Sequence, residues 1–246
     1  MPHPLDNPVR SSLTGPHARF AERRGNVLRY PVDVSPFLAL PDEPAEADWA
    51  DGAGLMGPGG GLLLLPGTAV QPPAGWEVTV LGEGVQMTGD DLAAVTDPEV
   101  VVLGSADVPE MLDLTHRTEP GPFLRRTFEL GTYLGLRRDG KLVAMAGERL
   151  HPAGWTEISA VCTDEAWRGQ GLGTRLVRAV GAGVRARGEI PFLHAVATNT
   201  TAIRLYELLG FRHRKVVAFA AVRVAQTQVP ASGAGRASTS ARRASS

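Results

Sequence analysis

The sequence predicts a mixed α/β protein (α+β), in which several β-strands alternate with a few amphipathic helices. Short apolar runs bounded by glycine, proline or aspartate recur along the chain, and such runs are typical of strands. In the second half, apolar residues at helical spacing form longer segments between these runs. With 246 residues, 43% of them hydrophobic, the chain is long enough to bury one large core or two modest ones.

The first 104 residues contain most of the prolines and predict a β-rich domain. Apolar runs separated by turn residues indicate strands at 27–30, 61–65, 76–81, 83–87 and 100–103. Residues 46–53 are able to form a short helix. Residues 1–104 carry no diphosphate-binding signature. They are either packed on the second half of the chain or form a small separate domain.

The second half has clearer periodicity and predicts one domain over residues 105–225. In chain order we expect helix 107–115, strands 133–137, 141–150 and 155–163, helix 171–187, strand 191–198, helix 200–209 and strand 215–223. Asp139 and Gly140 form a hairpin turn, and Gly188 and Gly210 are natural helix ends. Residues 226–246 predict a disordered tail, because the sequence from Val229 onward lacks bulky apolar side chains.

Strand 155–163 has an alternating pattern that places Ile158, Ala160 and Cys162 on one face and Glu157 on the other. Apolar side chains recur every four residues in helix 171–187, which indicates one buried face. A buried Cys162 thiol on such a face is expected to fill space rather than act as a nucleophile.

Composition excludes several classes of protein. Lys and Arg number 25 against 26 Asp and Glu, so binding to nucleic acid through phosphate contacts is disfavoured. A single cysteine excludes a disulfide framework and a cysteine-rich zinc site, and no metal site is expected. The amino-terminal sequence has no apolar segment typical of a signal peptide, and Leu62–Leu65 is too short to span a membrane. We expect a cytoplasmic protein without membrane contact, a monomer or a homodimer.

A glycine-rich turn after strand 155–163 is the most informative feature. Arg168, Gly169, Gly171 and Gly173 open helix 171–187, where the unpaired backbone N–H groups and the helix dipole favour an anion. The glycine spacing differs from a dinucleotide fingerprint, and the lysine of a nucleotide-binding phosphate loop is missing. From the residues alone, a diphosphate cradle and a glycine turn packed closely against the sheet both remain open.

Residues 168–173 resemble the R/Q-x-x-G-x-G/A signature of the GNAT superfamily of acyl-CoA N-acyltransferases. A second element follows in the family's order, with Asn199, Tyr206, Gly210 and Phe211 around the next helix. The resemblance covers residues 105–225 and implies a mostly antiparallel sheet flanked by helices. It also suggests that residues 1–104 are a degenerate second GNAT-like half.

The resemblance further implies roles for individual residues. Tyr206 would protonate the departing thiolate, and Asn199 would contact the pantetheine amide region. Pantetheine would bind the backbone of Val161, Cys162 and Thr163, and the pyrophosphate would bind the amides of Arg168, Gly169, Gln170, Gly171, Leu172, Gly173 and Thr174. Glu157 is the best candidate for a general base and Glu148 a second, although a strand carboxylate is often an ordinary ion-pair partner.

These features predict an N-acetyltransferase that moves an acetyl group from acetyl-CoA to a primary amine of a small molecule or peptide by direct attack. The alternative is a non-catalytic CoA-binding regulatory module, and a nucleotide-binding protein that uses the same turn is a third possibility. Residues 118–123, with Arg125 and Arg126, are either one wall of the acceptor pocket or a rigid connector.

Overall fold

The computed structural model describes residues 2–57, 60–66 and 72–225, and its framework is one eight-stranded sheet. Neighbouring strands are antiparallel everywhere except between β10 and β9, which run parallel. The strands, in the order in which they lie side by side, are β4 (Gly61–Pro66), β11 (Arg212–Val224), β5 (Trp76–Thr88), β10 (Ile190–Val196), β9 (Trp155–Thr163), β8 (Lys141–Glu148), β7 (Tyr133–Arg138) and β6 (Val101–Leu103). The mixed α/β class and the mostly antiparallel sheet are therefore confirmed.

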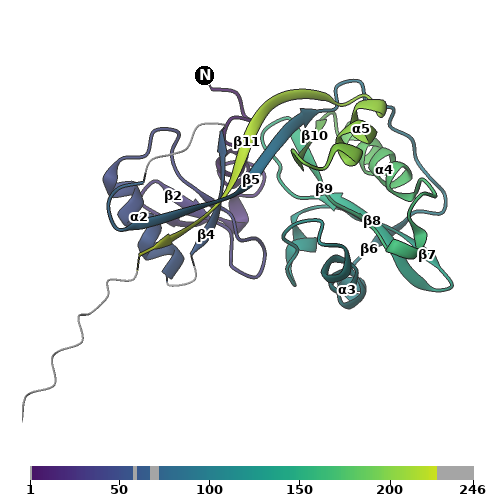
Figure 1. The fold of residues 1–246 in the computed structure, drawn as a ribbon, viewed down its shortest axis with the longest axis horizontal. Helices are drawn as coiled ribbons and strands as arrows, with labels where there is room; N and C mark the ends of the chain where they lie inside the picture. The colour runs from purple at the N-terminus through teal and green to yellow at the C-terminus, as the bar shows by residue number, and fades with distance from the viewer. Residues whose placement is uncertain (1, 58–59, 67–71, 226–246) are drawn as a thin grey trace, which may run out of the picture.

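Two helices cover opposite faces of the sheet. Helix α4 (Leu172–Ala186) buries its apolar stripe in a cluster that includes Ala146, whereas α3 (Val108–Thr118) packs in a cluster that includes Met145. Successive residues of a strand point to opposite faces of the sheet. Because Met145 and Ala146 are consecutive on β8, α3 and α4 pack on opposite faces. Helix α5 (Thr200–Leu208) joins the α4 side through Tyr206. Figure 1 shows α4 and α5 together, with α3 apart from them.

The amino-terminal region forms a second lobe. It contains α1 (Pro8–Leu13), the short strands β1 (Glu22–Arg24), β2 (Val27–Arg29) and β3 (Leu38–Ala39) in a three-stranded sheet, and α2 (Glu46–Met56). Its apolar side chains share a core with the other lobe, where Leu13 and Phe20 cluster with Leu130, Leu150 and Phe192. The lobes are thus packed on each other, and whether the first is a degenerate GNAT-like half stays a prediction.

Strands β5 and β11 have 13 residues each and run side by side from one lobe to the other (Figure 1). The apolar runs 76–81 and 83–87 are therefore parts of one continuous strand. Strands β4, β5 and β6 precede residue 105 and still belong to the main sheet. A domain boundary after residue 104 stays a prediction, and the predicted disordered tail 226–246 lies outside the described residues.

A β-bulge interrupts β9 at Ala160, whose φ is 51°, in the left-handed region. Ala160 and Val161 together face the single residue Ala146, because Ser159 pairs with Gly147 and Cys162 with Met145. The bulge reverses the alternation, so Ile158 lies in the α4 cluster while Ala160 and Cys162 lie in the α3 cluster. The expectation that these three side chains share one face is wrong, because simple alternation does not anticipate an extra residue.

Among the described residues, the other predicted strands and helices match observed elements to within three residues at each end. Helix α1 and strands β1 and β3 are additional elements that the sequence pattern did not predict. No helix formed by the described residues has both the length and the apolar character needed to cross a membrane.

Candidate active site

A cavity of about 700 Å³ lies where β9 and β10 separate. The two strands pair in parallel only from Trp155 to Glu157, and beyond Glu157 they diverge, which leaves one edge of β9 without a partner strand. Residues from both lobes line the cavity. They are Phe37, Leu81, Gly82, 118–122, Arg149, 158–163, Arg168, 194–196, Asn199, Thr201, Ala202, Tyr206, Phe219 and Ala220. Of the predicted segment 118–123, residues 118–122 line this cavity, whereas Phe123, Arg125 and Arg126 do not.

The glycine turn has the geometry of an anion-binding helix start. Gly169 and Gly171 have φ values of 77° and 74°, a left-handed conformation that glycine adopts without strain. Gly171 caps α4 without a side-chain hydrogen bond, and a Cβ built on it would meet no described atom within 4 Å. The space beside Gly169 and Gly171 is thus open, whereas a Cβ at Gly173 would lie 3.9 Å from Val161 and 4.0 Å from Thr163 of β9.

The backbone amides of this turn are largely unpaired. Arg168 donates its amide to the carbonyl of Glu165 at 3.3 Å, but the amides of residues 169–174 have no acceptor among the described residues. Unpaired N–H groups at a helix start carry a partial positive charge and bind phosphate readily. The Arg168 side chain donates to the Thr163 carbonyl at 3.4 Å and adds a cation beside them.

Two more predicted contacts lie along the same side of the cavity. The bulge at Ala160 and the missing partner strand leave backbone groups of Val161, Cys162 and Thr163 along the cavity. Asn199 caps α5 by accepting the Ala202 amide at 3.1 Å with its Oδ1. Its Nδ2 has no partner among the described residues and remains able to donate.

Tyr206 brings a phenol to the cavity. Its side chain packs edge-on against Phe211, with ring centroids 5.9 Å apart, and the residue is buried. The hydroxyl has no hydrogen-bond partner among the described residues. It is not fully buried, and Tyr206 lines the cavity, so the hydroxyl reaches the cavity. Burial raises the pKa of Tyr206 to about 12, which keeps its proton in place at neutral pH.

Glu157 has a different setting from the one expected. It is fully buried, it does not line the cavity, and Arg149 donates to both of its oxygens, Nε to Oε2 at 2.8 Å and Nη2 to Oε1 at 2.6 Å. His194 Nδ1 lies 2.7 Å from Oε1. Although burial opposes ionisation, Arg149 and His194 together lower the pKa of Glu157 to about 2. Glu157 as general base stays a prediction, and its side chain is ionised with both oxygens occupied.

The hydrogen bonds around Gln86 assign the donor and acceptor roles of the two His194 ring nitrogens. Gln86 Oε1 accepts from Arg214, so its Nε2 faces both the Leu5 carbonyl and His194 Nε2, at 3.0 Å each. The ring nitrogen Nε2 must then accept, and Nδ1 carries the proton that is donated to Glu157. His194 therefore orients Glu157 through this contact.

Glu148 and Cys162 are the remaining candidate side chains. Glu148 is buried and does not line the cavity, because Arg187 at 2.9 Å and the Thr132 amide at 3.1 Å hold its oxygens. Cys162 lines the cavity but is buried, and burial raises the pKa of its thiol to about 11. A protonated thiol in this setting agrees with a space-filling role.

Arg149, His194 and Phe37 are cavity residues that the sequence did not single out. Arg149 and His194 stand in strand-like runs with no motif around them, and Phe37 comes from the amino-terminal lobe. The available signal was a pair of adjacent charged residues, Glu148 and Arg149, at the end of an apolar strand-like run.

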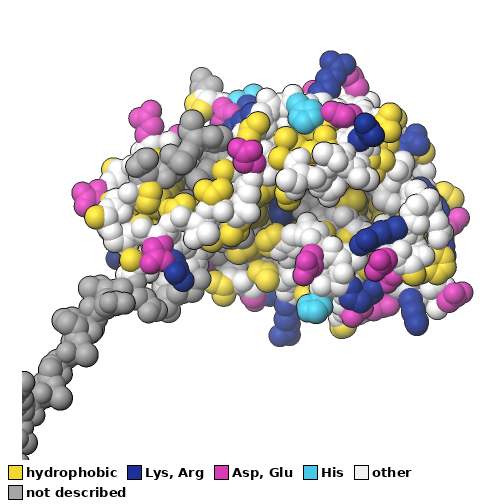
Figure 2. All heavy atoms as spheres, in the orientation of Figure 1, with side chains coloured by type: hydrophobic (Ala, Val, Ile, Leu, Met, Phe, Trp, Pro, Cys, Tyr) yellow, Lys and Arg dark blue, Asp and Glu magenta, His cyan; other side chains and the backbone are white. Residues whose placement is uncertain are grey.

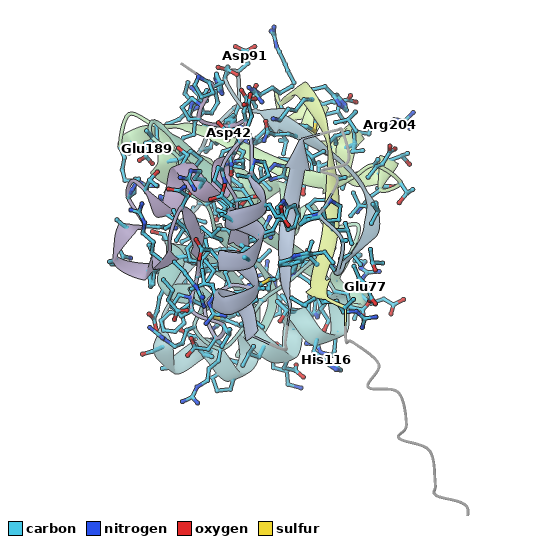
Figure 3. The ribbon with its side chains drawn as sticks, turned by 90° about the vertical axis from the view of Figure 1, so that its left-hand side faces the viewer. Asp42, Glu77, Asp91, His116, Glu189 and Arg204 are labelled. Atoms are coloured by element: carbon cyan, nitrogen blue, oxygen red, sulfur yellow. The ribbon has the colours of Figure 1, made fainter. Side chains whose placement is uncertain are left out.

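Few charges surround the cavity. The acidic and basic side chains that line it, apart from the His194 ring, are Glu119, Arg149 and Arg168. Hydrophobic side chains lie between the lobes in Figure 2, while acidic and basic groups such as Asp91 and Arg204 lie at the outside in Figure 3. Within the described ranges, no three His, Cys, Asp or Glu side chains are arranged to hold a metal ion.

Comparison with known proteins agrees with this geometry. The family model described as FR47-like protein matches residues 133–220. A solved structure of a GNAT-family protein from Novosphingobium aromaticivorans is 42% identical, with a TM-score of 0.84, over 92% of this chain and 100% of that one. A GCN5-related N-acetyltransferase from Kribbella flavida shares the fold, with a TM-score of 0.61 and 17% identity over 88% of this chain and 95% of that one. No curated protein gave a significant match. The identity and coverage of the Novosphingobium protein, together with the motifs, show that this chain belongs to the GNAT family of acetyltransferases.

Proposed function

We propose that this protein transfers an acetyl group from acetyl-CoA to a primary amine. The observation that supports this most directly is the set of unpaired amides at 169–174, which directly follow Arg168, a residue that lines the same cavity as Tyr206. The first feature suits a diphosphate, and the second suits a leaving group that needs a proton.

Acetyl-CoA fits the residues present. The amides of 169–174 and Arg168 would hold the pyrophosphate, where a Cβ at Gly171 would point into open space. The free edge of β9 at Val161 to Thr163 and the Nδ2 of Asn199 would bind the amide groups of the pantetheine arm. Bound acetyl-CoA supplies the reactive thioester, and this chain supplies the contacts and the proton.

The group transfer balances with one protein acid. The neutral amine forms a bond to the acyl carbon, and the carbon–sulfur bond breaks with its electron pair going to sulfur. Tyr206 gives its hydroxyl proton to sulfur, and the proton released by the nitrogen returns to the Tyr206 oxygen. The products are an amide and free CoA, and the raised pKa of Tyr206 favours this return.

Removal of the first proton from the ammonium form of the acceptor does not need Glu157 in this scheme. A carboxylate with a pKa near 2 and both oxygens occupied is a weak proton acceptor. We propose that water in the cavity takes this proton, and that Glu157 acts by holding Arg149.

Two measurements on the full chain test the function. Titration calorimetry with CoA measures binding, and release of free thiol from acetyl-CoA with a panel of amines measures turnover. Binding together with turnover supports the transferase. Binding without turnover for any amine would favour the CoA-binding module instead, and absence of CoA binding would overturn both functions.

A further inference from the structure

We propose that the amine acceptor also carries a carboxylate, and that Arg149 binds this carboxylate inside the cavity. This inference rests on the proposed function and concerns the acceptor alone. The simplest acceptors of this class are amino acids with an apolar side chain. Arg149 is then the residue that determines specificity for the carboxylate.

The donor geometry of Arg149 leads to this proposal. Its Nε and Nη2 donate to Glu157, and no hydrogen bond within the described residues involves Nη1. Nη1 is not fully buried either, and Arg149 lines the cavity, so Nη1 is open to the cavity. A guanidinium has five N–H donors in a planar fork, which suits a carboxylate.

The charge balance of the cavity points the same way. The Arg149 side chain is only 10% exposed, and the Glu157 carboxylate that balances its charge does not line the cavity. A ligand therefore meets the donor side of the pair. The two other charged groups of the lining, Glu119 and Arg168, are exposed, so Arg149 is the one buried charge that a ligand would meet among the described residues.

Neighbouring groups fix the Arg149 fork in place. The Arg149 amide donates to the Glu157 carbonyl at 3.0 Å, and the Glu157 amide donates to Leu150 at 2.7 Å, so the two side chains stand opposite each other on adjacent strands. His194 orients Glu157 from the other side, and the guanidinium carbon lies 5.1 Å from the centre of the Phe37 ring. A donor held in this way loses little conformational entropy when it binds an anion.

The remaining walls are apolar and suit an apolar acceptor body. Phe37 and Phe219 line the cavity together with Leu81, Pro120 and Pro122. Phe219 lies against Gly84, where an added Cβ would come within 2.5 Å of the ring.

Matched pairs of acceptors test the proposal on the full-length protein with acetyl-CoA. L-leucine is compared with L-leucinamide, and L-phenylalanine with its amide, by the release of free thiol. We expect kcat/KM for each acid to exceed that of its amide by about 10- to 100-fold, as for a hydrogen bond to a charged group. Equal rates for acid and amide would overturn the proposal.

A binding measurement keeps the test independent of turnover. N-acetyl-L-leucine and its amide are titrated into the CoA-loaded protein by calorimetry, and the acid should bind at least about 10-fold more tightly. If the acid does not bind better, the carboxylate proposal fails even though CoA still binds. If CoA itself does not bind, the proposed function fails, and the two results are distinguishable.

Three variants identify the residue responsible. Arg149→Lys keeps the charge but lacks the planar fork, and Arg149→Gln combined with Glu157→Gln removes both buried charges together. The preference for acid over amide should fall below about 3-fold in the double variant, with unchanged affinity for CoA. Arg126→Gln is the matched control, because Arg126 pairs with Glu129 and Asp33 away from the cavity, and it should keep the full preference. A double variant that folds and keeps the preference would contradict the assignment of Arg149.

Discussion

Arg149 lies side-on to Glu157, with Nε and Nη2 bonded to the two carboxylate oxygens at 2.8 and 2.6 Å. The Glu157 side chain has no exposed surface, so the pair is an internal salt bridge. Ion pairs in this setting gain little net stability over apolar residues, but loss of one partner is costly because it leaves a buried charge uncompensated. A structural role of Glu157 therefore predicts a large loss of stability when its charge is removed, whereas a role as base predicts a loss of turnover.

Glu157→Gln should therefore lower the free energy of unfolding by about 3 to 5 kcal/mol, measured by urea denaturation. The double variant Arg149→Gln with Glu157→Gln removes both charges and should recover most of the loss. A Glu157→Gln variant that is as stable as the wild type would show that Arg149 finds another partner. If turnover disappears while stability is unchanged, Glu157 is the base after all.

Tyr206→Phe should lower kcat by about 100-fold or more, since positioned acids typically contribute factors of 10² to 10⁴. The KM for acetyl-CoA should stay the same, because the phenol acts only as the thiolate leaves. Steady-state kinetics gives both constants, and thermal melting checks that packing against Phe211 is retained. Turnover equal to the wild type would reduce Tyr206 to a packing residue.

Gly171→Glu should weaken CoA binding by more than about 100-fold in titration calorimetry, because its carboxylate would occupy the anion position at the start of α4. Gly171→Asn is the conformational control, since asparagine tolerates the left-handed φ of 74° without adding charge. Gly183→Glu puts the same charge on an exposed position of the same helix and should bind CoA normally. CoA binding by Gly171→Glu at the level of the wild type would exclude the turn as the diphosphate site.

His17 predicts a pH dependence of stability. Burial, with a smaller effect of the nearby His151 ring, lowers the pKa of His17 from 6.5 to about 3. Between these values the unfolded chain binds a proton that the folded protein does not, so the free energy of unfolding should fall as pH drops below 6.5 and level off near pH 3. The slope from this one group is at most about 1.4 kcal/mol per pH unit.

His17→Gln removes this titration and should flatten the curve of stability against pH, as measured by urea denaturation at several pH values. The wild-type ring bonds to Tyr30 at 2.8 Å and to the Leu130 carbonyl at 2.9 Å, so the variant will be less stable at pH 7. An identical slope in wild type and variant would contradict the lowered pKa of His17.

Local sequence patterns predicted the elements around the glycine turn well. Alternation located β9, and fourfold spacing with Gly188 located α4, because strand and helix periods are local properties. For residues 118–123 and for the glycine turn the sequence left two alternatives open, and the structure places 118–122 along the cavity and open space beside Gly171.

Features that depend on distant residues escaped prediction. Spacing placed Glu157 on a strand face but gave no sign of Arg149 and His194, which meet it only after β8, β9 and β10 assemble. The bulge at Ala160 was equally invisible, because alanine carries no preference for a left-handed φ. Phe37 reaches the cavity through the packing of one lobe on the other.

The pairing of β5 with β11 has a consequence for how the chain assembles. Residues 76–88 leave the ribosome long before residues 212–224, yet the early strand lies between the late one and β10 in the sheet. Such long sequence separation slows folding, because the intervening chain must be closed into a loop before the contacts form. The nascent protein therefore carries an unsatisfied strand edge until residues 212–224 are made. A chain that stops before residue 212 lacks the strand that joins β4 to the rest of the sheet.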